Sequence, residues 1–215
     1  MRAPLIVGLG GTTSDGSATE RVLRASLDAA AALGARTRLL AGTDLDLPMY
    51  APGPGGRRAR ALVEALREAD GVILASPAYH GTISGLVKNA LDHAEDLRRA
   101  DPPYLEGRAV GCIAVAGGPQ AGAATLATLR AIGHALRGWP TPLGVAVDTS
   151  DRVFDAGGVV DDAVVLGRLD LLADQVVGFA RADRRTLAPQ PPPVPIGHSR
   201  LRTARSALVA RPAHR

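Results

Sequence analysis

Glycines and hydroxyl residues dominate a short segment near the amino end of the chain. Residues 10–19 read Gly-Gly-Thr-Thr-Ser-Asp-Gly-Ser-Ala-Thr and follow an apolar run that ends at Leu9. Glycine lets backbone N–H groups approach an anion, hydroxyl groups can donate to it, and a helix that begins here adds the positive end of its dipole. The composition is typical of a phosphate cradle. A plain capped turn is the alternative interpretation.

Two sharper phosphate motifs can be tested against this segment. A P-loop needs Gly-Lys-Ser or Gly-Lys-Thr, and the segment contains no lysine. A dinucleotide fingerprint needs a third glycine where this chain has Thr13, whose side chain obstructs the close approach of the helix. A classical NAD-binding Rossmann domain is therefore disfavoured, and a single monophosphate such as that of FMN suits the segment better.

A second segment carries a longer pattern. Residues 76–92 read Ser-Pro-Ala-Tyr-His-Gly-Thr-Ile-Ser-Gly-Leu-Val-Lys-Asn-Ala-Leu-Asp and follow a buried apolar run that begins at Gly71. Pro77, Tyr79, His80 and Gly81 should therefore stand at the carboxyl end of a strand. In an open α/β sheet this is where ligands bind, so a planar heterocycle could lie there.

Apolar runs and helical repeats alternate along the chain and must position both segments. We predict strands at 4–9, 37–41, 71–76, 108–116 and 143–147, and helices at 17–33, 57–69, 84–97, 121–137 and 161–182. Ser17 and Glu20 fit a capping box at the start of the first helix. This alternation requires a doubly wound α/β fold, a parallel sheet with helices on both faces. In the flavodoxin-like strand order 2-1-3-4-5, the loops after the first and third strands are neighbours.

Charge and proline content divide the chain near residue 182. The 215 residues carry a formal charge of +4, but residues 181–215 hold eight Arg and one Asp, a net of +7, which leaves −3 for residues 1–180. A nucleic-acid function is therefore not expected for the folded part. Five prolines in seven positions from Pro189 are typical of an extended linker. We expect one domain at 1–182 and a tail at 183–215 that is disordered or serves as an inter-subunit arm.

Composition also limits the compartment and the chemistry. No apolar run reaches the roughly 18 residues that a membrane-spanning helix needs. Cys112 is the single cysteine, so a cytoplasmic protein without disulfides is expected, and its apolar neighbours indicate an inert core residue. His80 and His93 lack further ligands at suitable spacing, so no metal site is expected. Trp139 is interpreted as a core or interface residue.

Residues 76–92 resemble the signature S-P-x-Y-x-G-S-x-S-G-x-L-K-N-x-L-D of the NADPH-dependent FMN reductase family, with Thr82 in place of the usual serine and Val87 beside the lysine. The similarity extends to Gly117-Gly118 and to residues 45–50, and it covers about residues 4–180. The family commonly carries an arginine in the first loop, where this chain has Thr-Ser-Asp at 13–15.

The resemblance implies FMN, with NADPH or NADH as the second ligand. It places the FMN phosphate among Gly11, Thr12, Thr13, Ser17, Ala18 and Thr19, the isoalloxazine ring against Pro77, Ala78, Tyr79, His80, Gly81, Thr82 and Ile83, and the ring or ribityl chain near Gly117 and Gly118. The implied activity is hydride transfer from nicotinamide to FMN and on to a second acceptor, which needs no catalytic acid or base from the protein.

The implied acceptor is free flavin for a partner flavin-dependent monooxygenase, or a small quinone-like molecule. A homodimer or homotetramer is expected because an exposed flavin needs a wall from elsewhere. Two alternatives remain open: a flavodoxin-like electron carrier without NAD(P)H oxidation of its own, and an enzyme on this scaffold that has lost flavin binding. The 3% aromatic content favours the reductase over the carrier, because flavodoxins flank the ring with aromatic side chains.

Overall fold

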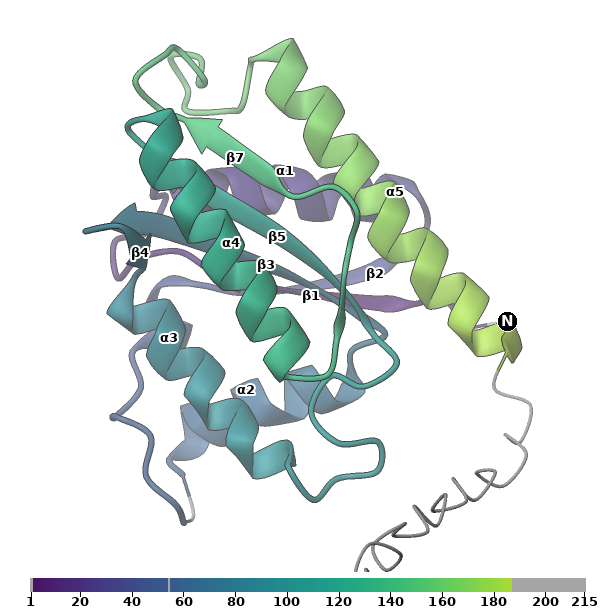
Figure 1. The fold of residues 1–215 in the computed structure, drawn as a ribbon. Coiled ribbons are helices and arrows are strands. Elements are labelled where there is room, and N and C mark those ends of the chain that lie inside the picture. Colours follow the sequence, from purple (N-terminus) through teal and green to yellow (C-terminus); the bar gives the residue numbers. More distant parts are fainter. Residues whose placement is uncertain (1, 54, 187–215) are drawn as a thin grey trace, which may run out of the picture.

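A sheet runs through the middle of the molecule, with helices on both faces (Figure 1). The computed structural model describes residues 2–53 and 55–186. The strands are β1 Leu5–Gly10, β2 Arg36–Leu40, β3 Gly71–Tyr79, β4 Thr82–Ile83, β5 Ala109–Ala116, β6 Trp139–Pro140 and β7 Val145–Asp148. The helices are α1 Ala18–Ala32, α2 Arg57–Glu68, α3 Gly85–Asp92, α4 Pro119–Ala135 and α5 Ala163–Thr186, with 3₁₀ turns η1 Gly42–Leu45 and η2 His93–Leu97.

The order of the main strands confirms the predicted topology. β2, β1, β3, β5 and β7 lie side by side and parallel, which is 2-1-3-4-5 when these five are counted along the chain. Their carboxyl ends therefore meet at one edge of the sheet, on the left of Figure 1, where β4 and the arrowhead of β7 lie. The loops after β1 and β3 are neighbours at this edge, as expected for such a sheet.

Two short strands were not predicted. β4 pairs antiparallel with the end of β3, so the residues after Ser76 form a hairpin before the next helix begins. β6 pairs with the start of β5, and β7 pairs with its end. Pro140 and Pro142 lie in and just after β6, and because proline has no N–H for the ladder, they interrupt what would otherwise be one edge strand.

Helix ends differ from the prediction where a side chain or a proline starts the helix. α4 begins at Pro119, because proline suits a first helical position, where its missing N–H would have no partner. α5 follows Asp162, whose Oδ1 accepts a hydrogen bond from the Val165 N–H at 2.8 Å. The described part of α5 reaches Thr186, so residues 183–186 of the predicted tail are helical, and the rest of that tail, 187–215, lies outside the described residues. None of the described helices is long and apolar enough to cross a membrane.

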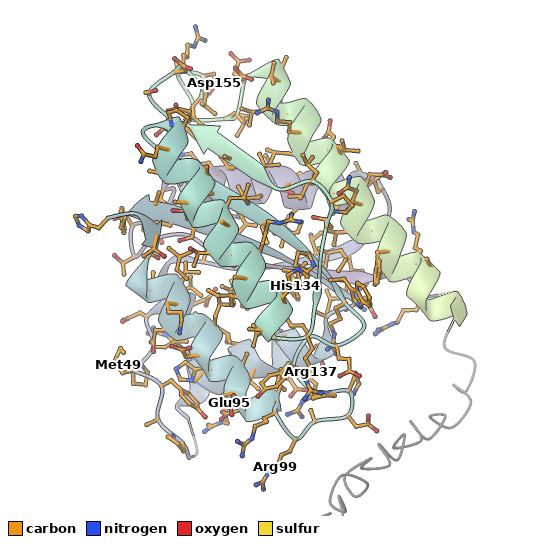
Figure 2. All side chains as sticks on the ribbon, in the orientation of Figure 1. Met49, Glu95, Arg99, His134, Arg137 and Asp155 are labelled. Atoms are coloured by element: carbon orange, nitrogen blue, oxygen red, sulfur yellow. The ribbon has the colours of Figure 1, made fainter. Side chains whose placement is uncertain are left out.

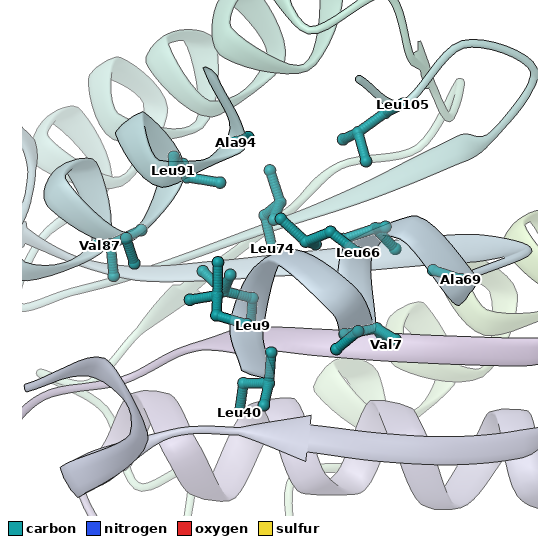
Figure 3. Packing of buried hydrophobic residues seen from close by; sticks show 14 of the residues in the cluster. Val7, Leu9, Leu40, Leu66, Ala69, Leu74, Val87, Leu91, Ala94 and Leu105 are labelled. Carbon is teal, nitrogen blue, oxygen red and sulfur yellow. The ribbon is translucent and has the colours of Figure 1, made fainter. Parts of the chain in front are cut away.

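One hydrophobic layer lies between the sheet and the helices α2, α3 and α4. Figure 3 shows Leu9 and Leu74 of the central strands in this layer together with Leu66 of α2 and Leu91 of α3. All four side chains are at most 3% exposed. The layer holds the strand ends, and with them the loops at the carboxyl edge, in fixed positions.

The other layer lies under α1 and α5 and depends on glycine in the sheet. A Cβ at Gly71 or Gly111 would stand 2.8 or 3.1 Å from Val176 of α5, so the helix packs directly on the strand backbones. Cys112 is fully buried in the first layer, which confirms a core residue, and burial raises the pKa of its thiol to about 12, which favours the protonated form. Trp139 is 61% exposed and stands beside Phe179, so it does not belong to the core.

Candidate functional site

Four segments meet at the carboxyl edge of the sheet. They are the first loop (residues 11–17), the hairpin (residues 78–83), the glycine pair (Gly117 and Gly118) and the β7 loop (residues 149–161). Thr149 joins the last two, because its backbone N–H and its hydroxyl both donate to the Ala116 carbonyl, at 2.8 and 3.1 Å. The sequence identified the first three segments. It did not identify the β7 loop, which was predicted only as a connection between the last strand and the last helix.

The first loop bonds largely to itself. Thr12 Oγ1 accepts a backbone N–H from two residues further on at 3.1 Å, and Ser17 Oγ accepts the Glu20 N–H at 3.3 Å, which confirms the predicted helix cap. Thr13 is exposed, whereas Thr19 is only 2% exposed. Thr13 and Ser17 can therefore offer a hydroxyl to a ligand. Thr12 takes part in the turn of the loop itself, and the side chain of Thr19 is buried.

Glu20 has a larger role than the cap alone suggests. Its side chain is 7% exposed, Oε2 accepts the Gly16 N–H at 3.1 Å, and Oε1 accepts both the Nε and the Nη2 of Arg24, at 2.9 and 2.7 Å. The carboxylate therefore occupies one N–H of the first loop and neutralises Arg24. Asp15 adds a second negative charge to the same loop.

The tip of the hairpin is exposed. His80 and Gly81 have φ of 51° and 88°, the left-handed pair that a two-residue hairpin turn of this hand requires. The side chains of Tyr79 and His80 face solvent, Tyr79 being 52% exposed, and Ala78 is half-buried. Thr82 Oγ1 lies 3.5 Å from a hydroxyl of α4. These residues form one accessible ridge at the carboxyl edge of the sheet.

The base of the hairpin is buried and internally bonded. Ser76 Oγ donates to the Pro77 carbonyl at 2.8 Å and accepts the Ser84 N–H at 3.0 Å. Ser84 Oγ in turn accepts the Val87 N–H at 3.2 Å and caps α3. Pro77 and Ile83 are buried here, so their side chains belong to the core and their backbone is what they can offer to a ligand.

Asn89 ties the hairpin region to residues 45–50. Its side chain is buried, with Oδ1 accepting the Tyr50 N–H at 2.9 Å and Nδ2 donating to the carbonyls of Leu47 and Pro48, at 3.2 and 3.1 Å. The buried His93 ring stands with Nε2 3.1 Å from the Pro48 carbonyl. Two segments that carry separate parts of the resemblance are therefore one structural unit, which sequence reasoning missed.

The glycine pair lies against open space. Neither Gly117 nor Gly118 has a left-handed φ, and a Cβ at either position would meet no heavy atom within 4 Å. Gly10, by contrast, is required by packing, because its Cβ would stand 2.0 Å from the Ala75 carbonyl oxygen. Nothing in the described protein requires glycine at 117 or 118, and the backbone there is open to a flat ligand.

A comparison with protein families decides the relationship. The family model described as NADPH-dependent FMN reductase matches residues 4–151. The chain belongs to this family. The resemblance drawn from residues 76–92 is thereby confirmed, and the first loop, the hairpin and the glycine pair of this FMN reductase family member all lie within the match. Most of the β7 loop lies beyond it.

Individual relatives and solved structures that are similar to this chain are also flavin proteins by name. The FMN-dependent NADPH-azoreductase of Staphylococcus haemolyticus is 35% identical over 118 residues, 54% of this chain and 59% of that protein. The match thus spans about six tenths of the relative's length. FerB, a flavoenzyme NAD(P)H:(acceptor) oxidoreductase from Paracoccus denitrificans, has a TM-score of 0.69 at 20% identity and covers 84% of this chain and 99% of its own. A WrbA-like flavodoxin from Agrobacterium tumefaciens has a TM-score of 0.59 at 18% identity, over 84% and 99%. The fold is flavodoxin-like, as predicted.

The residues of this FMN reductase family member fit a flavin mononucleotide, but unequally at its two ends. On the ring side, the glycine pair leaves room for a planar group and the hairpin tip is accessible. On the phosphate side, the first loop has N–H groups at the start of α1 and hydroxyls, yet it has no basic residue, and Glu20 occupies the Gly16 N–H. The counter-charge for a phosphate must come from outside the loop.

Proposed function

We propose that this protein is an NAD(P)H-dependent FMN reductase. The observation that carries the proposal is the glycine pair, open to a flat ligand beside the hairpin, within a chain that belongs to this family. When bound, the flavin supplies the chemistry, since it takes a hydride from a nicotinamide and passes electrons to an acceptor. The task of the protein is to hold and orient the ligands.

The residues divide this task by position. The hydroxyls of Thr13 and Ser17 and the free N–H groups at the start of α1 hold the phosphate. Backbone groups of residues 78–82 serve the polar edge of the ring, with Tyr79 beside it. The glycine pair lets the ring or the ribityl chain lie close to the backbone. No side chain has to donate or accept a proton in hydride transfer, so none is assigned as catalytic.

The second acceptor is a small oxidant. The Staphylococcus haemolyticus relative is named an azoreductase, so azo compounds join quinones and free flavin as candidates. Free flavin would make the protein a supplier of reduced flavin to a flavin-dependent monooxygenase. A cytoplasmic location fits a nicotinamide substrate and a lone buried thiol.

A homodimer or homotetramer completes the site in this proposal. Tyr79 is 52% and Met49 80% exposed, and Figure 2 shows Met49 extending from the rim of the molecule. A second copy could cover such apolar side chains and wall the ring. Size-exclusion chromatography should give at least twice the monomer mass, and a fully active monomer would contradict this part of the proposal.

The decisive test uses the purified full-length chain with NADPH or NADH and, in turn, FMN, a quinone and an azo dye. Nicotinamide oxidation that depends on flavin is the expected result. If the protein binds FMN but oxidises neither nicotinamide with any acceptor, it is an electron carrier. If it neither binds FMN nor oxidises a nicotinamide, the proposal is wrong.

A further inference from the structure

Arg21 stands beside the first loop without a carboxylate of its own. Its Nη2 and Nε lie 3.8 and 3.9 Å from the Cβ position of Gly16, the last residue before the cap of α1. Within the described parts of the chain, no ion pair joins Arg21 to an acidic side chain. Arg24, one turn later, differs because Glu20 binds its guanidinium through two hydrogen bonds.

The balance of charge makes this difference important. Asp15 and Glu20 contribute two negative charges to the neighbourhood of the first loop, and Arg21 and Arg24 contribute two positive ones. Arg24 forms an ion pair with Glu20, so its charge is already compensated. A phosphate monoester adds close to two negative charges at neutral pH. Arg21 is therefore the one cation of this group that remains available to compensate for them.

The β7 loop holds Arg21 in place. The Arg21 Cζ lies 5.8 Å from the centroid of the Phe154 ring, within the range of a cation–π contact. Gly158 has a φ of 80°, which favours glycine, and a Cβ there would stand 2.0 Å from Arg21 Nη1, so the glycine leaves the guanidinium room in its present position. Phe154 itself is fixed by a bridge to Val160 across the loop. Arg21 thus lies between the first loop and the β7 loop.

We propose that Arg21 binds the phosphate of FMN and that Phe154 and Gly158 position it for this purpose. The inference rests on the proposed function and adds a specificity to it: the protein distinguishes FMN from riboflavin chiefly through Arg21. Side chains on a helix lean toward its amino end, which directs Arg21 toward the first loop. A guanidinium also presents parallel donors that match two phosphate oxygens, as an ammonium group cannot.

The experiment compares dissociation constants for FMN and riboflavin, measured by the change in flavin fluorescence on binding. Arg21→Gln should weaken FMN binding by about ten- to a hundred-fold, the range for a lost hydrogen bond to a charged group, and leave riboflavin binding unchanged. Arg21→Lys should give an intermediate loss. Arg36→Gln removes the same charge from an exposed arginine at the amino end of β2 and should change neither constant.

A second variant tests how Arg21 is positioned. Phe154→Leu keeps the charge but removes the aromatic face, so the preference for FMN over riboflavin should fall by less than in Arg21→Gln. Equal FMN preference in the native protein and in Arg21→Gln would overturn the inference, whereas NADPH oxidation with FMN would leave the proposed function standing. A native protein that binds neither flavin would overturn both. Circular dichroism of each variant identifies any loss of fold. If Arg21→Gln does not fold, the flavin affinities of Phe154→Leu and Arg21→Lys test the inference instead.

Discussion

The hairpin region and the first loop are built in different ways, although they face each other across the same edge. In the hairpin region, Ser76 bonds to Ser84, Ser84 caps α3, and Asn89 fastens the neighbouring turn. The serine bonds join residues within one motif, whereas Asn89 reaches a turn that lies 39 to 42 residues earlier in the chain. The first loop has its own turn and cap, but the cation beside it, Arg21, lies against a loop more than a hundred residues further on.

This difference explains why one region could be identified from sequence and the other only in part. A structure held by local bonds leaves a contiguous pattern of residue types at fixed spacing. A charge that depends on Phe154 and Gly158 leaves no local pattern, because an arginine, a phenylalanine and a glycine are unremarkable where they stand. The first loop has no cation of its own. In the proposed site, Arg21 of α1 supplies it.

The largest loss of stability is expected at Gly10, directly before the first loop. In Gly10→Ala the new Cβ would lie 2.0 Å from the Ala75 carbonyl oxygen, and a backbone atom in the middle of a sheet cannot move away cheaply. We expect the free energy of unfolding to fall by about 4 kcal/mol or more, measured by urea denaturation. Gly85→Ala is the matched control in the hairpin region, because its Cβ meets open space at the start of α3. Equal stability of the two variants would contradict the packing argument.

A smaller but still large effect is expected in the hairpin region at Asn89. Asn89→Ala removes three hydrogen bonds, to the Leu47 and Pro48 carbonyls and from the Tyr50 N–H. Within the described residues, only the Pro48 carbonyl among these groups keeps another contact, with His93 Nε2. We expect a loss of about 2–4 kcal/mol of unfolding free energy, together with faster proteolysis in the turn before α2. Asn89→Asp keeps the acceptor for the Tyr50 N–H but loses both N–H donors. Its unfolding free energy should lie between those of the native protein and Asn89→Ala. If Asn89→Ala unfolds like the native protein, the two segments are not one unit.

Much of the fold follows from periodicity and chain order. Five strand–helix units require a parallel sheet, and the order 2-1-3-4-5 follows from the family resemblance and the switch point. Details that depend on tertiary contacts did not follow: the hairpin at Thr82, the edge strand divided by Pro140 and Pro142, and the exposure of Trp139. In each case the local structure or exposure depends on neighbours in space, and the periodicity of the sequence carries no information about them.

The candidate site shows the same limit. Spacing and residue type, together with the family resemblance, singled out the glycine pair and the hairpin tip, and both are accessible in the structure. They could not show that Pro77, Ile83 and Thr19 turn inward, since burial depends on the helices packed above them. Nor could they show Glu20 bonded to Gly16, because a capping box alone predicts a bond to the residue that caps the helix.

The caps of α1 and α3 allow two matched substitutions, each with a moderate expected loss of unfolding free energy. Ser84→Ala removes the cap of α3 at a side chain that is almost fully buried, so the Val87 N–H cannot turn to water instead. Ser17→Ala removes the cap of α1 at a partly exposed position. Unfolding free energies should fall by about 2 kcal/mol and about 1 kcal/mol, respectively, by urea denaturation. Only Ser17→Ala should also weaken FMN binding more than riboflavin binding. A reversed order of the two stability losses would contradict the difference in burial.

The smallest effect on stability is expected at Gly117, where a Cβ would meet open space. Gly117→Ala places a methyl group in open space on a backbone that has no left-handed φ, so its unfolding free energy should stay within about 0.5 kcal/mol of the native value. Binding should nevertheless weaken about ten-fold, because the methyl group occupies the space of the ring or the ribityl chain. FMN and riboflavin share both groups and should lose affinity equally, whereas Arg21→Gln affects FMN alone. Fluorescence titration of both flavins distinguishes a defect on the ring side from one on the phosphate side. An unchanged affinity for both in Gly117→Ala would show that the flavin does not lie against the glycine pair.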